Sequence, residues 1–270
     1  MSTKYVTSNL IGPSLQSNWS NYGLANQLFQ VATVLSYAID NDLQAVFPDL
    51  NDTNKQGNYK DNIFRNLSLD NPKVSKYATY TEGSFTFSPI PKFEDHPMIL
   101  LKDSYFQSEK YFVHNRDAIL DILDPSEDDM SYINDKYGKL LKNSSSCHIR
   151  RGDYIKLKQC HAPLYETDYY EKALSEMSSE NILLFTDDLS WCKENFNDPR
   201  ITFVEGEEDY MDIYIMSMCE HNIIANSSFS WWGAWLNTNP NKKVIAPKSW
   251  FGPACSHDIS NLVPSEWIRL

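Results

Sequence analysis

The sequence predicts an α/β protein with a parallel sheet. After residue 142, short apolar runs alternate with segments of helical pattern. The clearest run, Asn181–Phe185, is apolar from Ile182 onward and stops at Thr186-Asp187-Asp188, as expected of a buried parallel strand followed by a turn. Ile201–Val204 is the next strand of this kind. Strands that alternate with helices are typical of a parallel sheet with helices packed on its faces.

The later elements follow in the same alternation. Asp188 or Ser190 is expected to cap the helix after the first strand, because short polar side chains accept hydrogen bonds from the free N–H groups there. The remaining segments are a helix, a strand, a second helix and a last strand, at residues 209–219, 221–225, 230–237 and 243–246.

The first half of the chain has a weaker pattern. One helical stripe is formed by Leu28, Val31, Ala32, Leu35 and Tyr37. The other expectations are strands at 45–47 and 98–101, a helix at 109–123, an irregular region at 51–95 and a loop at 124–129. The serine-rich stretch 142–146 leads into a new strand and is a candidate domain boundary.

Composition excludes several classes of protein. The formal charge of −12 argues against a general binder of nucleic acids or anionic membranes, which would carry a basic face. The sequence has no signal peptide pattern and no integral membrane segment, since no stretch approaches 18 consecutive apolar residues. The five cysteines are scattered and form no C-x-x-C, which favours reduced thiols and a cytoplasmic protein.

The segment His148–Tyr154 is the first candidate site. Cys147, His148 and Ile149 can end a strand, which places Arg150 and Arg151 at its carboxyl edge, where open α/β sheets bind ligands. Arginine presents a planar, permanently charged fork that matches phosphate oxygens. Adjacent strand residues point to opposite faces, so one arginine can meet a ligand while the other is anchored. A plain arginine pair bound to a carboxylate is the structural alternative.

The second candidate is the segment 226–235, in which an asparagine and three serines precede a helix that starts at a strand end. Hydroxyls and free amides at a helix N-terminus form a good anion site. Ser227 and Ser228 are therefore either phosphate ligands or plain helix caps. Packing is the favoured role of the tryptophans here, and stacking on a base or sugar is the alternative.

Two weaker candidates complete the set. The segment 23–30 opens a helix with Gly23 followed by Asn26 and Gln27, whose amides could touch a diphosphate or act only as a cap. Asp187 and Asp188 follow a strand and could accept hydrogen bonds from a nucleoside. An adjacent acidic pair is weak evidence for a metal, and the histidines and cysteines show no zinc spacing, so no metal site is predicted.

Taken together, these segments resemble the family-eleven glycosyltransferases, the α-1,2-fucosyltransferases. The family hallmark H-x-R-R-x-D matches His148-Ile149-Arg150-Arg151-Gly152-Asp153. Four other segments match in family order: 23–30, 105–112, 186–188 and 223–232. The sequence departs from the family where the second glycine of the N-terminal motif is Ala25, and no apolar strand is obvious at 14–21.

The resemblance implies an inverting, metal-independent enzyme of the GT-B fold, with two Rossmann-like domains facing across a cleft. It implies no cofactor, GDP-fucose as donor, and transfer of L-fucose to the 2-hydroxyl of a galactoside carried by an oligosaccharide or a glycolipid. On this pattern residues 1–142 form the acceptor-side domain, 143–252 bind the donor, and 253–270 are expected to pack back on the first domain. The animal enzymes carry a membrane anchor, so this sequence resembles a bacterial or viral cytoplasmic form, with peripheral membrane contact left open.

The resemblance also implies roles for individual residues. Arg150 would bind the β-phosphate and stabilise the leaving diphosphate, and Asp153 beside it would complete the catalytic pair. The donor-binding residues carried over by motif are Gly23, Asn26, His148, Arg150, Asp187, Ser227, Ser228 and Phe229.

Three questions stay open at this point. The catalytic base is Asp153, Glu166, Asp168 or an acidic residue of the N-terminal half. The donor is GDP-fucose or another nucleotide sugar. A non-catalytic alternative is a carbohydrate-binding protein built on Trp231, Trp232 and Trp235, which would bind glycans without nucleotide.

Overall fold

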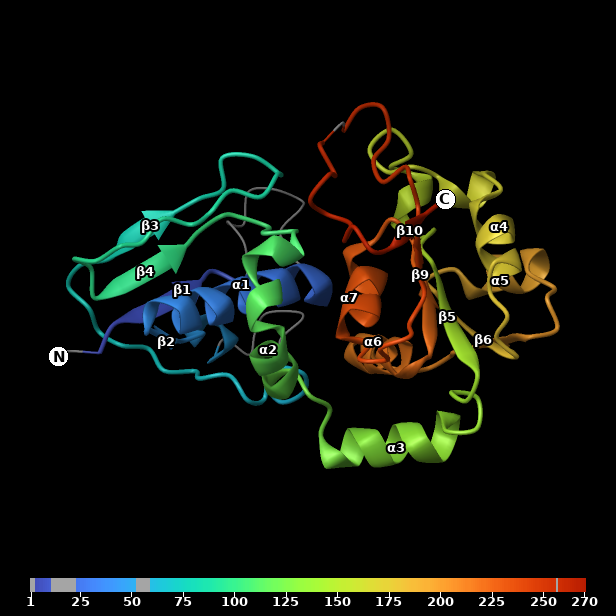
Figure 1. Ribbon diagram of the computed structural model, residues 1–270, viewed down its shortest axis with the longest axis horizontal. Coiled ribbons are helices and arrows are strands. Elements are labelled where there is room, and N and C mark those ends of the chain that lie inside the picture. Colours follow the sequence, from blue (N-terminus) through green and yellow to red (C-terminus); the bar gives the residue numbers. More distant parts are fainter. Residues whose placement is uncertain (1–2, 11–22, 52–58, 256) are drawn as a thin grey trace. The chain divides into compact units, whose positions relative to one another are not determined.

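The structure is a computed structural model that describes residues 3–10, 23–51, 59–255 and 257–270 (Figure 1). It divides into two compact units, Met1–Asp124 with Asp258–Leu262, and Pro125–His257 with Val263–Leu270. The boundary expected near residue 142 therefore moves to Asp124, and only five residues of the C-terminal tail join the first unit. Helix α3 (Glu127–Tyr137) causes this shift, because it packs against α6 (Asp209–Met218) of the second unit.

The first unit contains a parallel sheet of four described strands in the order β2-β1-β4-β3. The long helix α1 (Leu24–Asn41) buries most of its length and contacts β1. The strands and the remaining helix of this unit are β1 (Tyr5–Ser8), β2 (Gln44–Ala45), β3 (Ala78–Tyr80), β4 (Met98–Leu101) and α2 (Arg116–Ile122). Short 3₁₀ turns follow β2 and precede α2, at Pro48–Asn51, Glu109–Tyr111 and Val113–Asn115.

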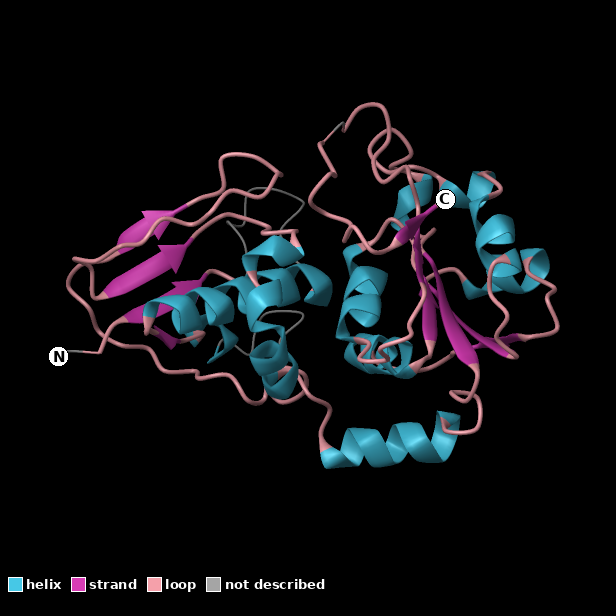
Figure 2. Cartoon of the chain, in the orientation of Figure 1, coloured by secondary structure: helices cyan, strands magenta, loops and turns pink. Residues whose placement is uncertain are grey.

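The second unit contains a parallel sheet of six described strands in the order β10-β9-β8-β5-β6-β7. Helices lie on both of its faces, α4 and α5 on one and α6 and α7 on the other (Figures 1 and 2). The strands are β5 (Ser144–Ile149), β6 (Asn181–Thr186), β7 (Ile201–Phe203), β8 (His221–Ile223), β9 (Val244–Ala246) and β10 (Ile268–Arg269). The helices not yet bounded are α4 (Tyr169–Ser175), α5 (Leu189–Asn195) and α7 (Ser228–Leu236), with 3₁₀ turns at Asp153–Ile155 and Leu164–Glu166.

The α/β prediction is confirmed, and the helices and strands expected after residue 180 all form, with ends within two residues of those expected. Asp188 caps α5, accepting the N–H of Trp191 at 3.3 Å. The loop expected at 124–129 is wrong in part, because α3 begins at Glu127. There the Ser126 and Asp129 side chains form a reciprocal capping box that satisfies N–H groups at the helix start.

The expectation of reduced thiols is wrong for two of the five cysteines. Cys160 and Cys255 form a disulfide, with Cα atoms 4.7 Å apart and a sequence separation of 95. The other three, Cys147, Cys192 and Cys219, are free and buried. The pairing arises because the segment around His161 runs antiparallel to the segment around Phe251.

Candidate functional site

Strand β5 lies in the middle of the second sheet, between β6 and β8, and all six of its residues are buried. Its side chains alternate between the two faces. Cys147 and Ile149 join the apolar cluster formed with α4 and α5. His148 faces the other way and bonds to Ser230 of α7. The chain then leaves the sheet at its carboxyl edge, where Arg150 and Arg151 follow.

Arg150 lies between two carboxylates and one aromatic ring. Its Nη2 is 2.8 Å from Asp153 Oδ1 and its Nη1 is 3.1 Å from Asp187 Oδ2. The guanidinium carbon lies 5.6 Å from the ring centre of Tyr154. The Arg150 side chain remains 35 % exposed, so the guanidinium is held in place and still open to a ligand.

Arg151 points to a different set of partners and is more enclosed. It pairs with Asp188, and its guanidinium carbon lies 4.5 Å from the ring centre of Trp191 and 5.3 Å from that of Tyr165. The structure thus separates the two arginines, as the alternation along the chain predicts. One faces outward at the strand end and the other is fixed against aromatic rings.

The turn after the arginines is organised by Asp187. Its Oδ1 accepts the N–H groups of Arg151 and Gly152, at 2.8 and 3.1 Å, while its Oδ2 meets Arg150. A Cβ on Gly152 would lie 2.6 Å from Asp187 Oδ2. Any other residue at this position would displace the carboxylate that orients the guanidinium, so the glycine is required by close approach.

His148 is a neutral member of this edge. Burial together with the nearby Arg150 charge lowers its pKa to about 3, so it carries no charge at neutral pH. Its Nδ1 lies 2.9 Å from Ser230 Oγ, which also accepts the N–H of Ala225 at 3.1 Å. The positive charge at the end of β5 therefore comes from the guanidinium groups alone. The hydrogen bond between His148 and Ser230 links β5 to the first turn of α7.

The start of α7 lies beside this strand end, with the ring of Phe229 5.4 Å from that of His148. Ser227 caps the helix by accepting the N–H of Phe229 at 3.3 Å, so the capping role predicted as one alternative is present. Ser228 is the first helical residue. The tryptophans behind it, Trp231, Trp232 and Trp235, are buried against one another, which confirms packing.

Gly23 and Asn26 belong to the first unit, at the start of α1. Gly23 is exposed, and its carbonyl accepts the N–H of Asn26 at 2.9 Å. The Asn26 side chain accepts a hydrogen bond from Gln107 at 2.8 Å, which joins the N-terminal motif to the segment 105–112. The structure thus brings together the predicted residues of the second unit, while these two remain in the first.

Each of the named candidates for the catalytic base is paired with a cation. Asp153 meets Arg150, Glu166 pairs with Lys158, and Asp168 lies 2.6 Å from Lys172. The Asp153 contact is made by Oδ1, so this carboxylate orients the Arg150 guanidinium whichever of the three takes the acceptor proton.

Sequence reasoning missed the aromatic side of this site. Tyr154 stacks on His161 with ring centres 3.9 Å apart and planes 9° apart, and its hydroxyl donates to the carbonyl of Asn226 at 3.1 Å. Ser230 was likewise not singled out as the partner of His148. Their positions depend on chain segments distant in sequence, so spacing carried no signal for them.

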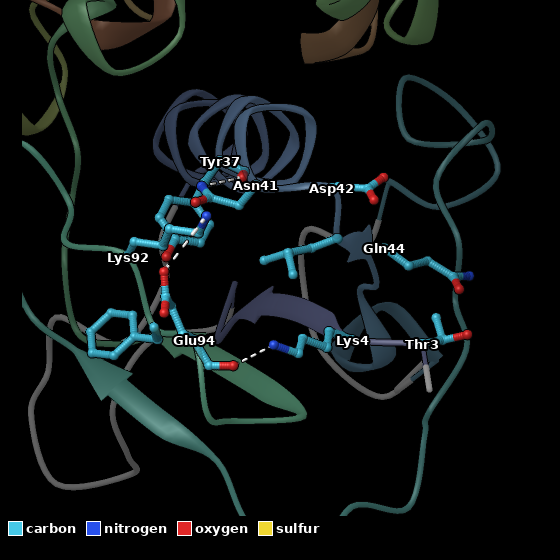
Figure 3. Close-up of a pocket in the computed structure, with 10 residues that line it drawn as sticks. Thr3, Lys4, Tyr37, Asn41, Asp42, Gln44, Lys92 and Glu94 are labelled. Atoms are coloured by element: carbon cyan, nitrogen blue, oxygen red, sulfur yellow. Dashed lines mark hydrogen bonds and ion pairs between the residues drawn. The ribbon is translucent and has the colours of Figure 1, made fainter. Parts of the chain in front are cut away.

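A separate hollow of about 680 Å³ lies in the first unit (Figure 3). Lys4, Gln44 and Asn41 line it, at the starts of β1 and β2 and the end of α1. This is the amino edge of the parallel sheet, whereas ligands of open α/β sheets bind at the carboxyl edge. None of the predicted site residues borders it, so we assign the candidate site to the end of β5 instead.

The described residues lack two further features. No group of three or more histidine, cysteine or acidic side chains there is arranged to hold a metal ion. No described helix has the length and apolar character needed to cross a membrane.

The sequence matches a known protein family and is similar to several curated proteins. The model of the family described as Glycosyl transferase family 11 matches residues 9–269. The O-antigen biosynthesis glycosyltransferase WbnK of Escherichia coli is 39 % identical over 184 residues, covering 62 % of this chain and 59 % of the relative. The alpha-1,2-colitosyltransferase of Escherichia coli is 30 % identical over 177 residues, covering 62 % of this chain and 61 % of the relative. The matches thus span about three fifths of the length of these relatives.

Among solved structures, the chain is similar to the NodZ alpha-1,6-fucosyltransferase soaked with GDP-fucose. The TM-score is 0.58 at 12 % identity, with 87 % of this chain and 93 % of that one covered. At this identity the likeness concerns the fold, and it supports the GT-B class predicted for the chain.

Proposed function

The chain belongs to glycosyl transferase family 11, and from that premise we propose that it transfers L-fucose from GDP-fucose to the 2-hydroxyl of a galactoside. The observation that carries this proposal is the position of Arg150, partly exposed at the carboxyl end of the central strand β5 between Asp153 and Asp187. The sequence pattern around it is the family hallmark H-x-R-R-x-D.

The chemistry of the transfer requires a cation at this place. When the bond between sugar and phosphate breaks, negative charge accumulates on the leaving diphosphate and the sugar gains oxocarbenium character. Arg150 supplies a fixed positive fork for the β-phosphate, and the N-terminus of α7 supplies N–H groups and the positive end of a helix dipole. Together they would provide the stabilisation that a divalent metal ion gives elsewhere.

The other residues take supporting roles in this proposal. Asp187 and Asp153 orient Arg150, and Asp187 also approaches the nucleoside. His148 lines the donor site as a neutral group, with Ser227, Ser228 and Phe229 beside the diphosphate. Gly23 and Asn26 of the first unit are kept as donor-binding residues on their sequence motif alone. The base that takes the acceptor proton stays unassigned. The proposal includes no cofactor.

A direct test is to incubate the protein with GDP-fucose and a panel of β-galactosides, with and without EDTA. We expect transfer to the 2-hydroxyl of at least one acceptor, at the same rate with and without chelator. Loss of activity with EDTA would contradict the metal-free mechanism. Absence of transfer to every galactoside, with free GDP-fucose hydrolysis also absent, would contradict the fucosyl assignment.

The name of one relative suggests a second candidate donor for this chain. It is named an alpha-1,2-colitosyltransferase, and colitose differs from fucose only in lacking the 3-hydroxyl. The diphosphate site would be the same for both donors, so only the sugar distinguishes them. Rates with GDP-fucose and GDP-colitose on one acceptor separate the two, and a strong preference for GDP-colitose would overturn the choice of fucose.

The non-catalytic alternative has lost its basis. A carbohydrate-binding surface on the tryptophan cluster requires exposed rings, whereas Trp231, Trp232 and Trp235 are 0, 0 and 2 % exposed. We therefore keep the enzyme as the proposal.

A further inference from the structure

Two segments distant in sequence are fastened together beside the candidate site (Figure 1). Residues 159–162 and 250–255, called the clamp below, share three backbone hydrogen bonds. Gly252 N–H donates to Cys160 O at 2.8 Å, Ala254 N–H to Gln159 O at 2.8 Å, and Ala162 N–H to the carbonyl of residue 250 at 3.3 Å. The Cys160–Cys255 disulfide closes the same pair of segments. The clamp therefore restrains the position of His161, which lies within it.

His161 projects from the clamp onto Tyr154. The two rings are nearly parallel, 9° apart, with centres separated by 3.9 Å. The His161 ring also lies 6.3 Å from that of Phe251, the residue it pairs with across the clamp. Burial and the Arg150 charge lower the pKa of His161, while the Asp153 charge acts in the opposite direction. A neutral imidazole can stack in this place without repelling the guanidinium.

The clamp also fixes the far end of Tyr154. The Tyr154 hydroxyl donates to the Asn226 carbonyl at 3.1 Å. The Asn226 side-chain amide in turn donates to Ala162 O at 3.0 Å and to Trp250 O at 2.8 Å, one acceptor on each segment of the clamp. Tyr154 is thus held by its face and by its hydroxyl, and both restraints lead back to the clamp.

Tyr154 also meets Arg150, whose guanidinium carbon lies 5.6 Å from the ring centre. We infer that His161 is a positioning residue for Arg150, acting through the Tyr154 ring to hold the guanidinium where a diphosphate binds. This inference rests on the proposed function, because it assumes that Arg150 contacts the β-phosphate. His161 itself touches no reacting atom in this scheme.

A positioning role and a purely structural role of His161 predict different effects on the binding of GDP and GMP. GDP carries the β-phosphate that Arg150 is proposed to bind, whereas GMP lacks it. If His161 acts through Arg150, its loss weakens GDP binding and leaves GMP binding nearly unchanged. If His161 only supports the fold, its loss weakens both nucleotides together.

The experiment is calorimetric measurement of Kd for GDP and GMP with the full chain. For His161→Ala we expect GDP to bind about fivefold more weakly, in the range of coupling between neighbours in one network, with GMP changed less than about twofold. His161→Phe keeps a flat ring and should restore GDP binding to within about twofold. His221→Ala is the matched control, since that histidine lies on β8 and contacts Lys243 instead of the site.

A double-mutant cycle completes the test. In the Arg150→Ala background, His161→Ala should have no further effect on GDP binding, because the group it positions is gone. An additional fivefold loss there, or equal loss of GDP and GMP in the single variant, would overturn the inference. If His161→Ala does not fold, His161→Leu is measured in its place. Failure of the unaltered protein to bind GDP would overturn the proposed function itself, whereas GDP binding that no His161 variant alters would overturn only this inference.

Discussion

The carboxyl edges of the two parallel sheets differ in the charge they present. At the end of β5, in the second unit, two arginines meet three aspartates, and the guanidinium of Arg150 remains partly exposed. After β3 and β4, in the first unit, the described side chains include the single cation Lys102, which lies 3.3 Å from Asp103, and the carboxylate of Glu82, with no arginine among residues 81–84 and 102–108. There Glu82 accepts the N–H of Phe106 at 2.8 Å and the hydroxyl of Tyr111 at 3.0 Å.

The difference shows how a protein with a negative net charge can form a binding site for an anion. With a formal charge of −12, the protein gathers guanidinium groups at one strand end and supports them with carboxylates. The first edge instead uses its carboxylate to hold the backbone. Phe106 has a φ of 54°, a left-handed conformation that costs a bulky residue energy, and Glu82 accepts its N–H. At the first edge the Glu82 carboxylate stabilises a backbone conformation, whereas at the second edge the carboxylates orient a cation.

The largest expected effect comes from removing the charge at the second edge. Arg150→Ala should lower kcat/KM by about 150-fold, which corresponds to roughly 3 kcal/mol of lost transition-state stabilisation, because the leaving diphosphate loses its fixed cation. Steady-state kinetics with GDP-fucose measures this. Arg150→Lys keeps a positive charge but not the planar fork, so its kcat/KM should lie between those of the wild type and Arg150→Ala. Near-normal turnover in a folded Arg150→Ala protein would remove the catalytic role of this edge.

An intermediate effect is expected at the first edge, and on stability instead of turnover. Glu82→Leu should lower the free energy of unfolding by about 2 kcal/mol, because the buried donors of Phe106 and Tyr111 lose their acceptor. Urea denaturation measures it, and Glu82→Gln, which keeps one carbonyl acceptor, should cost less. The comparison between the edges would fail if Glu82→Leu weakened GDP binding as much as Arg150→Ala does.

The smallest effect concerns the proton balance of the second unit. The pKa of His148 is lowered from 6.5 to about 3, chiefly by burial, so the unfolded chain binds its proton more tightly and stability falls as pH drops below 6.5. The pKa of Asp212 is raised from 3.8 to about 7, chiefly by burial and also by Glu207 and Asp209. For Asp212 the folded chain binds the proton more tightly, so stability rises as pH falls below about 7.

These two contributions oppose each other between pH 6.5 and 5. We expect His148→Gln to gain unfolding free energy relative to wild type on acidification, and Asp212→Asn to lose it, each by about 1.4 kcal/mol per pH unit. Urea titrations of the three proteins at pH 6.5 and 5.5 measure the slopes. Parallel pH profiles for all three would show that His148 is not held neutral at the edge.

Much of the second unit could be predicted from sequence because its strands are short buried apolar runs that end in polar turns. The same reading placed Arg150 and Arg151 at a strand end with different surroundings, since alternation follows from strand geometry alone. The first unit was harder. Strand β1 is only Tyr5–Ser8, and Val6 is its one side chain without a hydroxyl, so it lacks an apolar run.

Other features were missed for physical reasons that can be named. Helix α3 is a polar surface helix, and its one usable sequence signal was the capping pair Ser126 and Asp129. The Cys160–Cys255 pairing depends on two segments that meet only in the folded chain, so spacing could not reveal it. The stack of His161 on Tyr154 depends on that same meeting, which is why the aromatic side of the site could not be derived from the motif.

The buried tryptophan cluster also has an optical consequence. Of the seven tryptophans in the sequence, six lie in the second unit and the seventh, Trp19, lies outside the described residues. Trp231, Trp232, Trp235, Trp250 and Trp267 are at most 5 % exposed, so water scarcely reaches their indole rings. Intrinsic fluorescence of the native protein should thus be blue-shifted, and its red shift on denaturation should follow mainly the unit that carries Arg150, giving that unit a spectroscopic signal of its own.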